Sequence, residues 1–145
     1  MVKEILLLVV VCFISSSFSA VPEHHFSPTL LSIYQDWQRR CRMYTGTTEE
    51  LIKQTQEGKF PEDESIKRYT DCLYTHHDYM VGPDNIVDTR KLKYLLPEGS
   101  EAILESVRKC NLDLVNAGET NLTELLWNMH KCYHDNIDPS LYYFY

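Results

Sequence analysis

The cysteines are the residues of this 145-residue chain whose type and spacing point most directly to a chemistry, which is disulfide formation. Cys12 lies in an apolar N-terminal stretch that we expect to be removed, which leaves four: Cys41, Cys72, Cys110 and Cys132. An even number of cysteines in a secreted chain indicates two disulfides. Zinc is the alternative, but zinc ligands usually lie about two to four residues apart, whereas at least 21 residues separate these neighbouring cysteines. Four cysteines allow three pairings, and spacing alone does not choose between them.

Histidines offer a second chemistry, which is proton binding near neutral pH. The chain has six: His24, His25, His76, His77, His130 and His134. Protonating all of them would move the formal net charge from −7 to −1. We expect His76 to act as a pH switch, because it falls on an apolar helix face where a charge would disfavour burial. A hydrogen-bonded structural histidine is the alternative interpretation.

Catalytic and metal-binding patterns are weak. His130 and His134 are spaced as two metal ligands on a helix can be, but no Glu follows His130 and no third ligand is evident, so we assign them to a solvated helix face. His77 and Asp78 are similar to the His-Asp pair of secreted phospholipase A2, yet the adjacent cysteines and the Gly-rich calcium loop of that family are missing. No Ser-His-Asp or phosphate-binding motif is present. We therefore expect no enzyme, no cofactor and no metal.

The N-terminus has the order of a secretory signal peptide: Lys3, an apolar run over residues 5–14, then small residues over 15–20. We expect a signal peptide over residues 1–19, with cleavage after Ser19 or Ala20, and a secreted, extracellular protein; a buried N-terminal helix is the alternative. The ten-residue run is shorter than the ~20 residues that a membrane span needs, so no membrane insertion is expected.

Composition predicts one globular domain over residues 20–145. Hydrophobic residues make up 43% of the chain, and no repeat, low-complexity tract or linker divides it. With 14 Lys and Arg against 21 Asp and Glu, the net charge of −7 would repel a phosphate backbone, so nucleic acid is excluded as a partner.

Capping signals and glycines delimit helices and no strands. Ser27 precedes Pro28, and Thr47 and Asn121 each have a Glu three residues later, which predicts capping boxes. Asn121 also begins a glycosylation sequon, but we expect it to stay unmodified because its side chain caps a helix. The expected helices are 28–44, 48–57, 62–80, 89–96, 100–117 and 122–136, followed by a C-terminal tail, 137–145. Apolar residues recur three or four apart in the longer ones and place all four cysteines on inward faces, which predicts an all-α bundle stapled from helix to helix.

The cysteine spacing resembles that of the insect odorant-binding proteins, in their four-cysteine Minus-C branch. The family pattern has six cysteines, with three residues between the second and third and eight between the fifth and sixth. The four cysteines here match the first, third, fourth and sixth, and the missing two fall on Arg68 and Thr123. The stretch over 67–72 and the ending over 138–144 also resemble the family.

The resemblance implies disulfides Cys41–Cys72 and Cys110–Cys132, in a bundle of about six helices around a central apolar cavity. It places Arg68 beside Thr123, and we expect the Arg68 head to turn out to water. It implies a carrier that binds a small hydrophobic molecule, such as an odorant or pheromone, and moves it through aqueous lymph, with a chemoreceptor as a further candidate partner. A secreted structural, defensive or protein-interaction member of the same fold is the alternative, and a phospholipase A2-like enzyme comes last.

The apolar stripes by themselves favour a solid core, and only the resemblance favours a pocket. The expected ligand-binding residues are Trp37, Tyr69, Leu73, His76, Leu92, Leu96, Val107, Leu114, Leu126, Met129, Tyr133, Tyr143 and Phe144. The last two belong to an aromatic tail that is too apolar to stay in solvent, so we expect it to fold back and wall the pocket. A contact in a homodimer is the other role considered for this tail.

Overall fold

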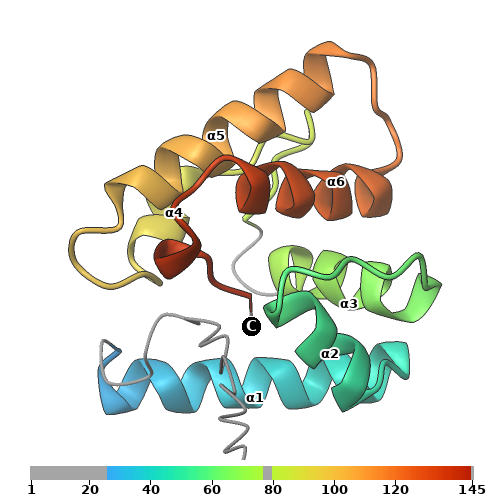
Figure 1. The fold of residues 1–145 in the computed structure, drawn as a ribbon, viewed down its shortest axis with the longest axis vertical. Helices are drawn as coiled ribbons and strands as arrows, with labels where there is room; N and C mark the ends of the chain where they lie inside the picture. The colour runs from blue at the N-terminus through green and yellow to red at the C-terminus, as the bar shows by residue number, and fades with distance from the viewer. Residues whose placement is uncertain (1–25, 77–79, 145) are drawn as a thin grey trace, which may run out of the picture.

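The computed structural model describes residues 26–76 and 80–144, and their fold is all-α (Figure 1). The predicted signal peptide, Cys12 and the His77–Asp78 pair lie outside these residues. The helices are α1 Pro28–Thr45, α2 Glu49–Gln56, α3 Glu64–Thr75, α4 Thr89–Lys93, α5 Glu101–Asn116 and α6 Leu122–Asp135, followed by a 3₁₀ turn, η2 Pro139–Leu141. Among the described residues, no helix is both long and apolar enough to cross a bilayer.

Side-chain caps fix where the helices begin. The Ser27 hydroxyl accepts a hydrogen bond from the Leu30 N–H at 3.2 Å, and Asn121 accepts one from Glu124 N–H at 3.3 Å, as predicted. The predicted cap of α2 is wrong by one residue: the Thr48 side chain caps this helix, and Thr47 is buried before it. Local hydrogen bonding therefore determines these helix starts.

Helix α3 ends at Thr75, so its predicted end at residue 80 is wrong. The chain beyond Met80 folds into a tight loop instead, with a β-bridge between Val81 and Val87. The buried Asn111 of α5 holds this loop, because its side chain accepts from Val87 N–H at 2.9 Å and donates to the Asn85 carbonyl at 3.0 Å. Backbone groups of the loop therefore bond to Asn111 instead of forming helical hydrogen bonds.

Two disulfides connect neighbouring helices, and their pairing confirms the prediction. Cys41–Cys72 joins α1 to α3 with Cα atoms 5.7 Å apart, and Cys110–Cys132 joins α5 to α6 at 5.8 Å. Figure 1 shows the resulting order across the molecule, with α3 between α1 and α6, and α5 on the far side of α6. The seam between α3 and α6 lies between the two stapled pairs.

Polar contacts hold the α3–α6 seam. The Lys67 ammonium lies 2.9 Å from a Glu124 carboxylate oxygen, and the Thr123 hydroxyl donates to Asp71 at 2.6 Å. These contacts join residues on both sides of Arg68 to Thr123 and its neighbour. Arg68 itself is exposed, as predicted.

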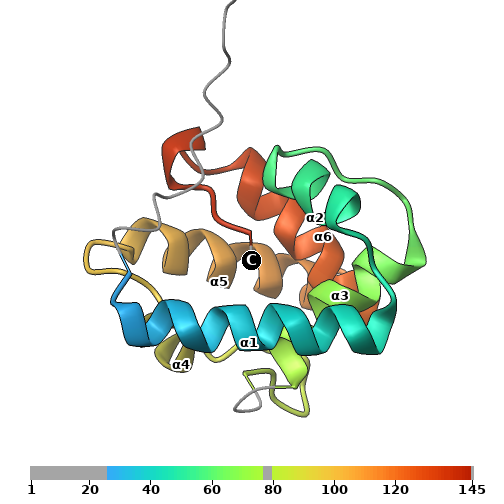
Figure 2. The same cartoon turned by 90° about the horizontal axis from the view of Figure 1, so that it is seen from below.

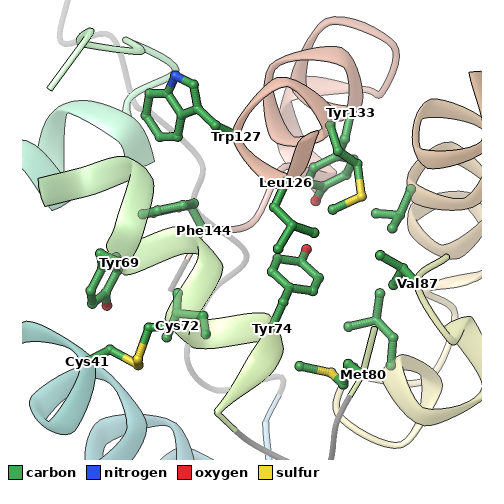
Figure 3. Close-up of a cluster of buried hydrophobic side chains, with 14 of the residues drawn as sticks. Cys41, Tyr69, Cys72, Tyr74, Met80, Val87, Leu126, Trp127, Tyr133 and Phe144 are labelled. Atoms are coloured by element: carbon green, nitrogen blue, oxygen red, sulfur yellow. A yellow bond between two sulfur atoms is a disulfide. The ribbon is translucent and has the colours of Figure 1, made fainter. Parts of the chain in front are cut away.

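The core lies where α3, α5 and α6 meet the C-terminal tail. Its largest fully buried side chains are Trp127, Tyr69, Tyr133, Ile66, Leu125, Leu126, Met129 and Val107. In Figure 3, Leu126 of α6 and Tyr74 of α3 point toward each other, and Phe144 of the tail lies beside α3. The tail is therefore part of the core.

Candidate functional site

The C-terminal tail turns back into the bundle after α6. The Asp138 carboxylate accepts a hydrogen bond from Ser140 N–H at 2.8 Å, which caps η2 and reverses the chain. Tyr142 and Phe144 are then only 4% and 3% exposed. Figures 1 and 2 both place the chain end at the centre of the molecule, among α1, α3 and α6. The prediction that the tail folds back over the bundle is confirmed.

Tyr133 of α6 fixes the start of this reversed segment. Its hydroxyl donates to the Leu141 carbonyl at 3.1 Å and accepts from the Tyr143 N–H at 2.9 Å. One buried phenol therefore satisfies two backbone groups of the tail. This contact explains why a side chain in the middle of an apolar stripe is a tyrosine.

Helix α2 holds the far end of the tail. The Tyr142 hydroxyl donates to the Thr55 carbonyl at 3.0 Å, and the Gln56 amide donates to the Phe144 carbonyl at 3.3 Å. Gly58 follows α2 with φ +75°, and the His134 ring packs so closely against it that a Cβ there would clash. The end of α2 thus packs closely against α6 as well as against the tail.

Phe144 occupies the interior between α3 and α6. Its ring centroid lies 6.1 Å from that of Tyr69 and 5.1 Å from that of His130. Figure 3 shows the ring pointing between these two helices. An aromatic side chain from the chain end therefore fills space that faces the apolar centre of the bundle.

His130 is the buried polar group of this interior. It is 3% exposed, and its Nε2 lies 3.1 Å from the Tyr74 hydroxyl, while its Nδ1 has no hydrogen-bond partner among the described residues. Burial lowers the pKa of His130 to about 3, because the charged ring would lose its hydration. The imidazole is therefore neutral at physiological pH, with one ring nitrogen left without a hydrogen-bond partner among the described residues.

The assignment of His130 to a solvated helix face is wrong. The sequence does contain a signal for its burial, because His130 lies four residues after Leu126 and three before Tyr133, both on the apolar face of α6. The expectation that His76 lies on a buried helix face is also wrong. Since α3 ends at Thr75, His76 leaves the inward stripe and is exposed, where its ring stacks on Tyr44 with centroids 5.8 Å apart.

The other predicted ligand-binding residues divide by burial. Those buried are Trp37, Tyr69, Leu73, Leu92, Val107, Leu126, Met129, Tyr133 and Phe144; those partly buried are Leu96, Leu114 and Tyr143. All twelve of these residues belong to one hydrophobic cluster or pack against it, whereas His76 does not. Trp37, Leu73 and His76 also line a separate hollow between α1 and α3.

Fold and site together define a small helical protein that is stapled by two disulfides and whose C-terminal tail packs into its interior. Residues 23–136 match the PBP/GOBP family, which is more than half of the chain. The chain therefore belongs to this family of insect odorant- and pheromone-binding proteins, which are carriers rather than enzymes. The described residues contain no group of three His, Cys, Asp or Glu side chains that could hold a metal ion. The tail lies beyond the matched region.

Proposed function

We propose that this protein is a secreted carrier that binds small hydrophobic molecules inside the helical bundle and moves them through aqueous lymph. Family membership supports the general role. The observation that carries the specific proposal is the buried tail, whose Tyr142 and Phe144 side chains occupy the interior without a covalent bond to it. A ligand of similar apolar area can take their place.

The free-energy cost of moving Phe144 into water is similar to the gain from burying a ligand in its place. An aromatic side chain buries about 150–250 Å², so moving Phe144 into water costs on the order of 4–6 kcal/mol at about 25 cal/mol per Å². A ligand that buries a comparable apolar area offsets this cost. Two hydrogen bonds break as well, from Gln56 to the Phe144 carbonyl at 3.3 Å and from the Tyr142 hydroxyl to the Thr55 carbonyl at 3.0 Å, and each adds about 1 kcal/mol to the cost.

His130 and Tyr74 favour a ligand with a neutral polar group. The free Nδ1 of His130 faces a buried environment, and burial also raises the pKa of the Tyr74 phenol, so both groups stay uncharged. Neutral donors and acceptors bind alcohols, esters or aldehydes without leaving an unpaired buried charge. We therefore expect such ligands to bind more tightly in the interior than carboxylates of the same length.

The same proposal covers the chain ends and partners. We propose cleavage after Ser19 or Ala20, secretion of residues 20–145, and membership of the four-cysteine Minus-C branch. A chemoreceptor is the proposed recipient of the ligand. Burial of Tyr142 and Phe144 within the bundle argues against a homodimer built on the tail, because the same faces cannot serve both contacts.

Displacement of a fluorescent apolar probe from the oxidised protein over residues 20–145 tests the carrier role. A panel of alcohols, esters, terpenoids and fatty acids should compete at micromolar concentration, with neutral compounds ahead of carboxylates. If correctly folded protein takes up no probe, the carrier role fails, and a structural or defensive role in the same fold becomes the better interpretation.

Deletion of residues 142–145 tests the part played by the tail. If the tail walls the interior, its loss should change probe affinity and speed probe release. Sedimentation provides the comparison, because unchanged affinity together with the loss of a dimer would assign the tail to a protein contact instead.

A further inference from the structure

A hollow of ≈ 200 Å³ lies between α1 and α3, next to the Cys41–Cys72 disulfide. We call it the α1–α3 hollow, and its lining residues are Asp36, Trp37, Arg40, Cys41, Cys72, Leu73 and His76. None of them comes from α5, α6 or the tail. The hollow is therefore separate from the interior that Phe144 fills.

The base of the α1–α3 hollow is apolar. Trp37 and Leu73 are 8% and 5% exposed, and the disulfide lies beside them. The volume is below the range of about 300–1,000 Å³ typical of sites for drug-sized ligands. A matching ligand is thus small, with a body no larger than one aromatic ring or a short alkyl chain.

The rim carries an arginine with unused donors. One Asp36 oxygen accepts from Arg39 at 2.5 Å, and the other lies 2.7 Å from Nε of Arg40. Among the described residues, the two terminal Nη nitrogens of Arg40 have no acceptor. Since Nε is already held by Asp36, the guanidinium is oriented before any ligand arrives.

The charge around this half of α1 favours an anion, although the whole chain is acidic. Among the described residues, Arg39, Arg40 and Arg42 form ion pairs with two carboxylates, Asp36 and Glu49. This part of α1 therefore carries one arginine more than it has paired carboxylates, on a chain whose formal net charge is −7. Asp36, which itself lines the hollow, is neutralised by its two arginine partners. Arginine binds a carboxylate through two parallel hydrogen bonds, which gives direction as well as attraction.

We propose that the α1–α3 hollow is a second binding site, which takes a small carboxylate with an apolar body. The body rests against Trp37 and Leu73, and the carboxylate accepts hydrogen bonds from the Nη atoms of Arg40. The His76 ring, stacked on Tyr44, closes one side. This inference goes beyond the carrier function and does not depend on it.

Titration of the oxidised protein over residues 20–145 with phenylacetate tests the proposal, and 2-phenylethanol is the neutral match with the same ring and chain. Calorimetry should give saturable binding of phenylacetate and at least about tenfold weaker binding of the alcohol. In NMR spectra, the signals of the Trp37 indole and the Leu73 methyls should shift, while those of the Met129 methyl should not.

Two matched variants locate the anion. Arg39 and Arg40 both pair with Asp36, and their side chains are 63% and 65% exposed, but only Arg40 lines the hollow. Arg40→Gln should weaken phenylacetate binding about tenfold, whereas Arg39→Gln should change it by less than about twofold. Absence of saturable binding, an equal loss in both variants, or equal affinity for the alcohol would overturn the proposal.

A fluorescent apolar probe bound in the same sample separates this site from the interior. Phenylacetate should bind without displacing the probe; displacement that follows its own binding curve would place it in the interior and overturn the second site. If the probe does not bind while phenylacetate binds in an Arg40-dependent way, the hollow stands and the carrier function fails.

Discussion

Helix α6 is joined to its two neighbours in two different ways. Cys132 ties it covalently to Cys110 of α5, whereas its seam with α3 is held by noncovalent contacts, which are apolar packing inside and polar contacts at the edge. The outer contacts are the Lys67–Glu124 ion pair and the Thr123–Asp71 hydrogen bond. A covalent link holds at every pH, but hydrogen bonds and ion pairs can open and re-form. We therefore expect the α3–α6 seam to open more readily than the disulfide-linked helix pairs.

The polar seam also has an inner layer. His130 of α6 and Tyr74 of α3 form a buried hydrogen bond at 3.1 Å, beside the Phe144 ring. Opening the seam would thus expose the site at which we place the ligand. The two seams differ in one respect: disulfides join α1 to α3 and α5 to α6, whereas no covalent bond joins α3 to α6, which flank the interior.

Removing the covalent seam should have the largest effect. The double variant Cys110→Ser, Cys132→Ser should lose about 2–5 kcal/mol of unfolding free energy, because the unfolded chain regains the freedom of the closed loop. Urea unfolding at pH 7 measures this loss. A loss below about 1 kcal/mol would show that noncovalent packing alone holds α5 to α6.

Adding a covalent link to the polar seam should give the next largest effect, with opposite sign. Arg68→Cys with Thr123→Cys should form a third disulfide and raise the unfolding free energy by about 2–4 kcal/mol. Probe release from the interior should slow as well. The serine pair, Arg68→Ser with Thr123→Ser, is the control. If the two thiols stay reduced under oxidising conditions, the family alignment at these positions is wrong.

The inner layer of the polar seam should make stability depend on pH. Because the pKa of His130 is near 3 in the fold and near 6.5 when unfolded, the unfolded state binds its proton first as the pH falls. Stability is therefore lost with falling pH below about 6.5, by about 2 kcal/mol between pH 7 and pH 5.

Unfolding free energies at pH 7 and pH 5 measure this loss. His130→Gln should remove it, whereas His76→Gln, at an exposed histidine, should retain it. Equal pH dependence in the wild type and in His130→Gln would mean that another group is responsible.

The outer polar contacts should have the smallest effect. Lys67→Met removes a buried ammonium that pairs with Glu124 and Glu62, and we expect a loss of about 1 kcal/mol. Lys109→Met is the control, since Lys109 forms an exposed pair with Asp113 on α5 and should cost less than about 0.5 kcal/mol. Urea unfolding compares the two, and an equal loss would deny the α3–α6 seam any special contribution.

A carboxylate at the edge of the seam, Glu62, titrates at a lower pH than the range in which His130 affects stability. Hydrogen bonds from Lys131 and Lys67 lower the pKa of Glu62 to about 2. Glu62 thus keeps its charge through the range in which His130 affects stability. Because the pKa of Glu62 is near 4.5 in the unfolded chain, most of the stability that its ion pairs contribute is lost below pH 5, outside the range of the His130 experiment.

Local signals were sufficient for much of the fold. Ser27 and Asn121 begin helices because each side chain bonds to an N–H only three residues away, so no distant contact is needed. The cysteine pairing followed from spacing shared with a known family, since spacing alone left three possibilities. The spans of α1 and α6 were predicted within one residue.

The ends of other elements depended on contacts from far along the chain. Asn111 holds the loop after α3, and this contact spans 24 residues to Val87. Because the loop replaces the expected last turn of α3, the register that would have buried His76 does not exist. The burial of His130 has a related cause, because its neighbours Tyr74 and Phe144 come from α3 and the tail, which the pattern of one helix does not reveal.

The sequence by itself determined the helices, the inward faces that carry the cysteines, and the tendency of the aromatic tail to leave water. Each of these depends on residues within a few positions of one another or on composition. Only the tertiary structure decided that Phe144 fills the interior and that His130, among the described histidines, is buried. It also decided that Arg40 and Trp37 line the same hollow. Those outcomes require side chains from separate helices to share one space, and packing in three dimensions alone determines which side chains do so.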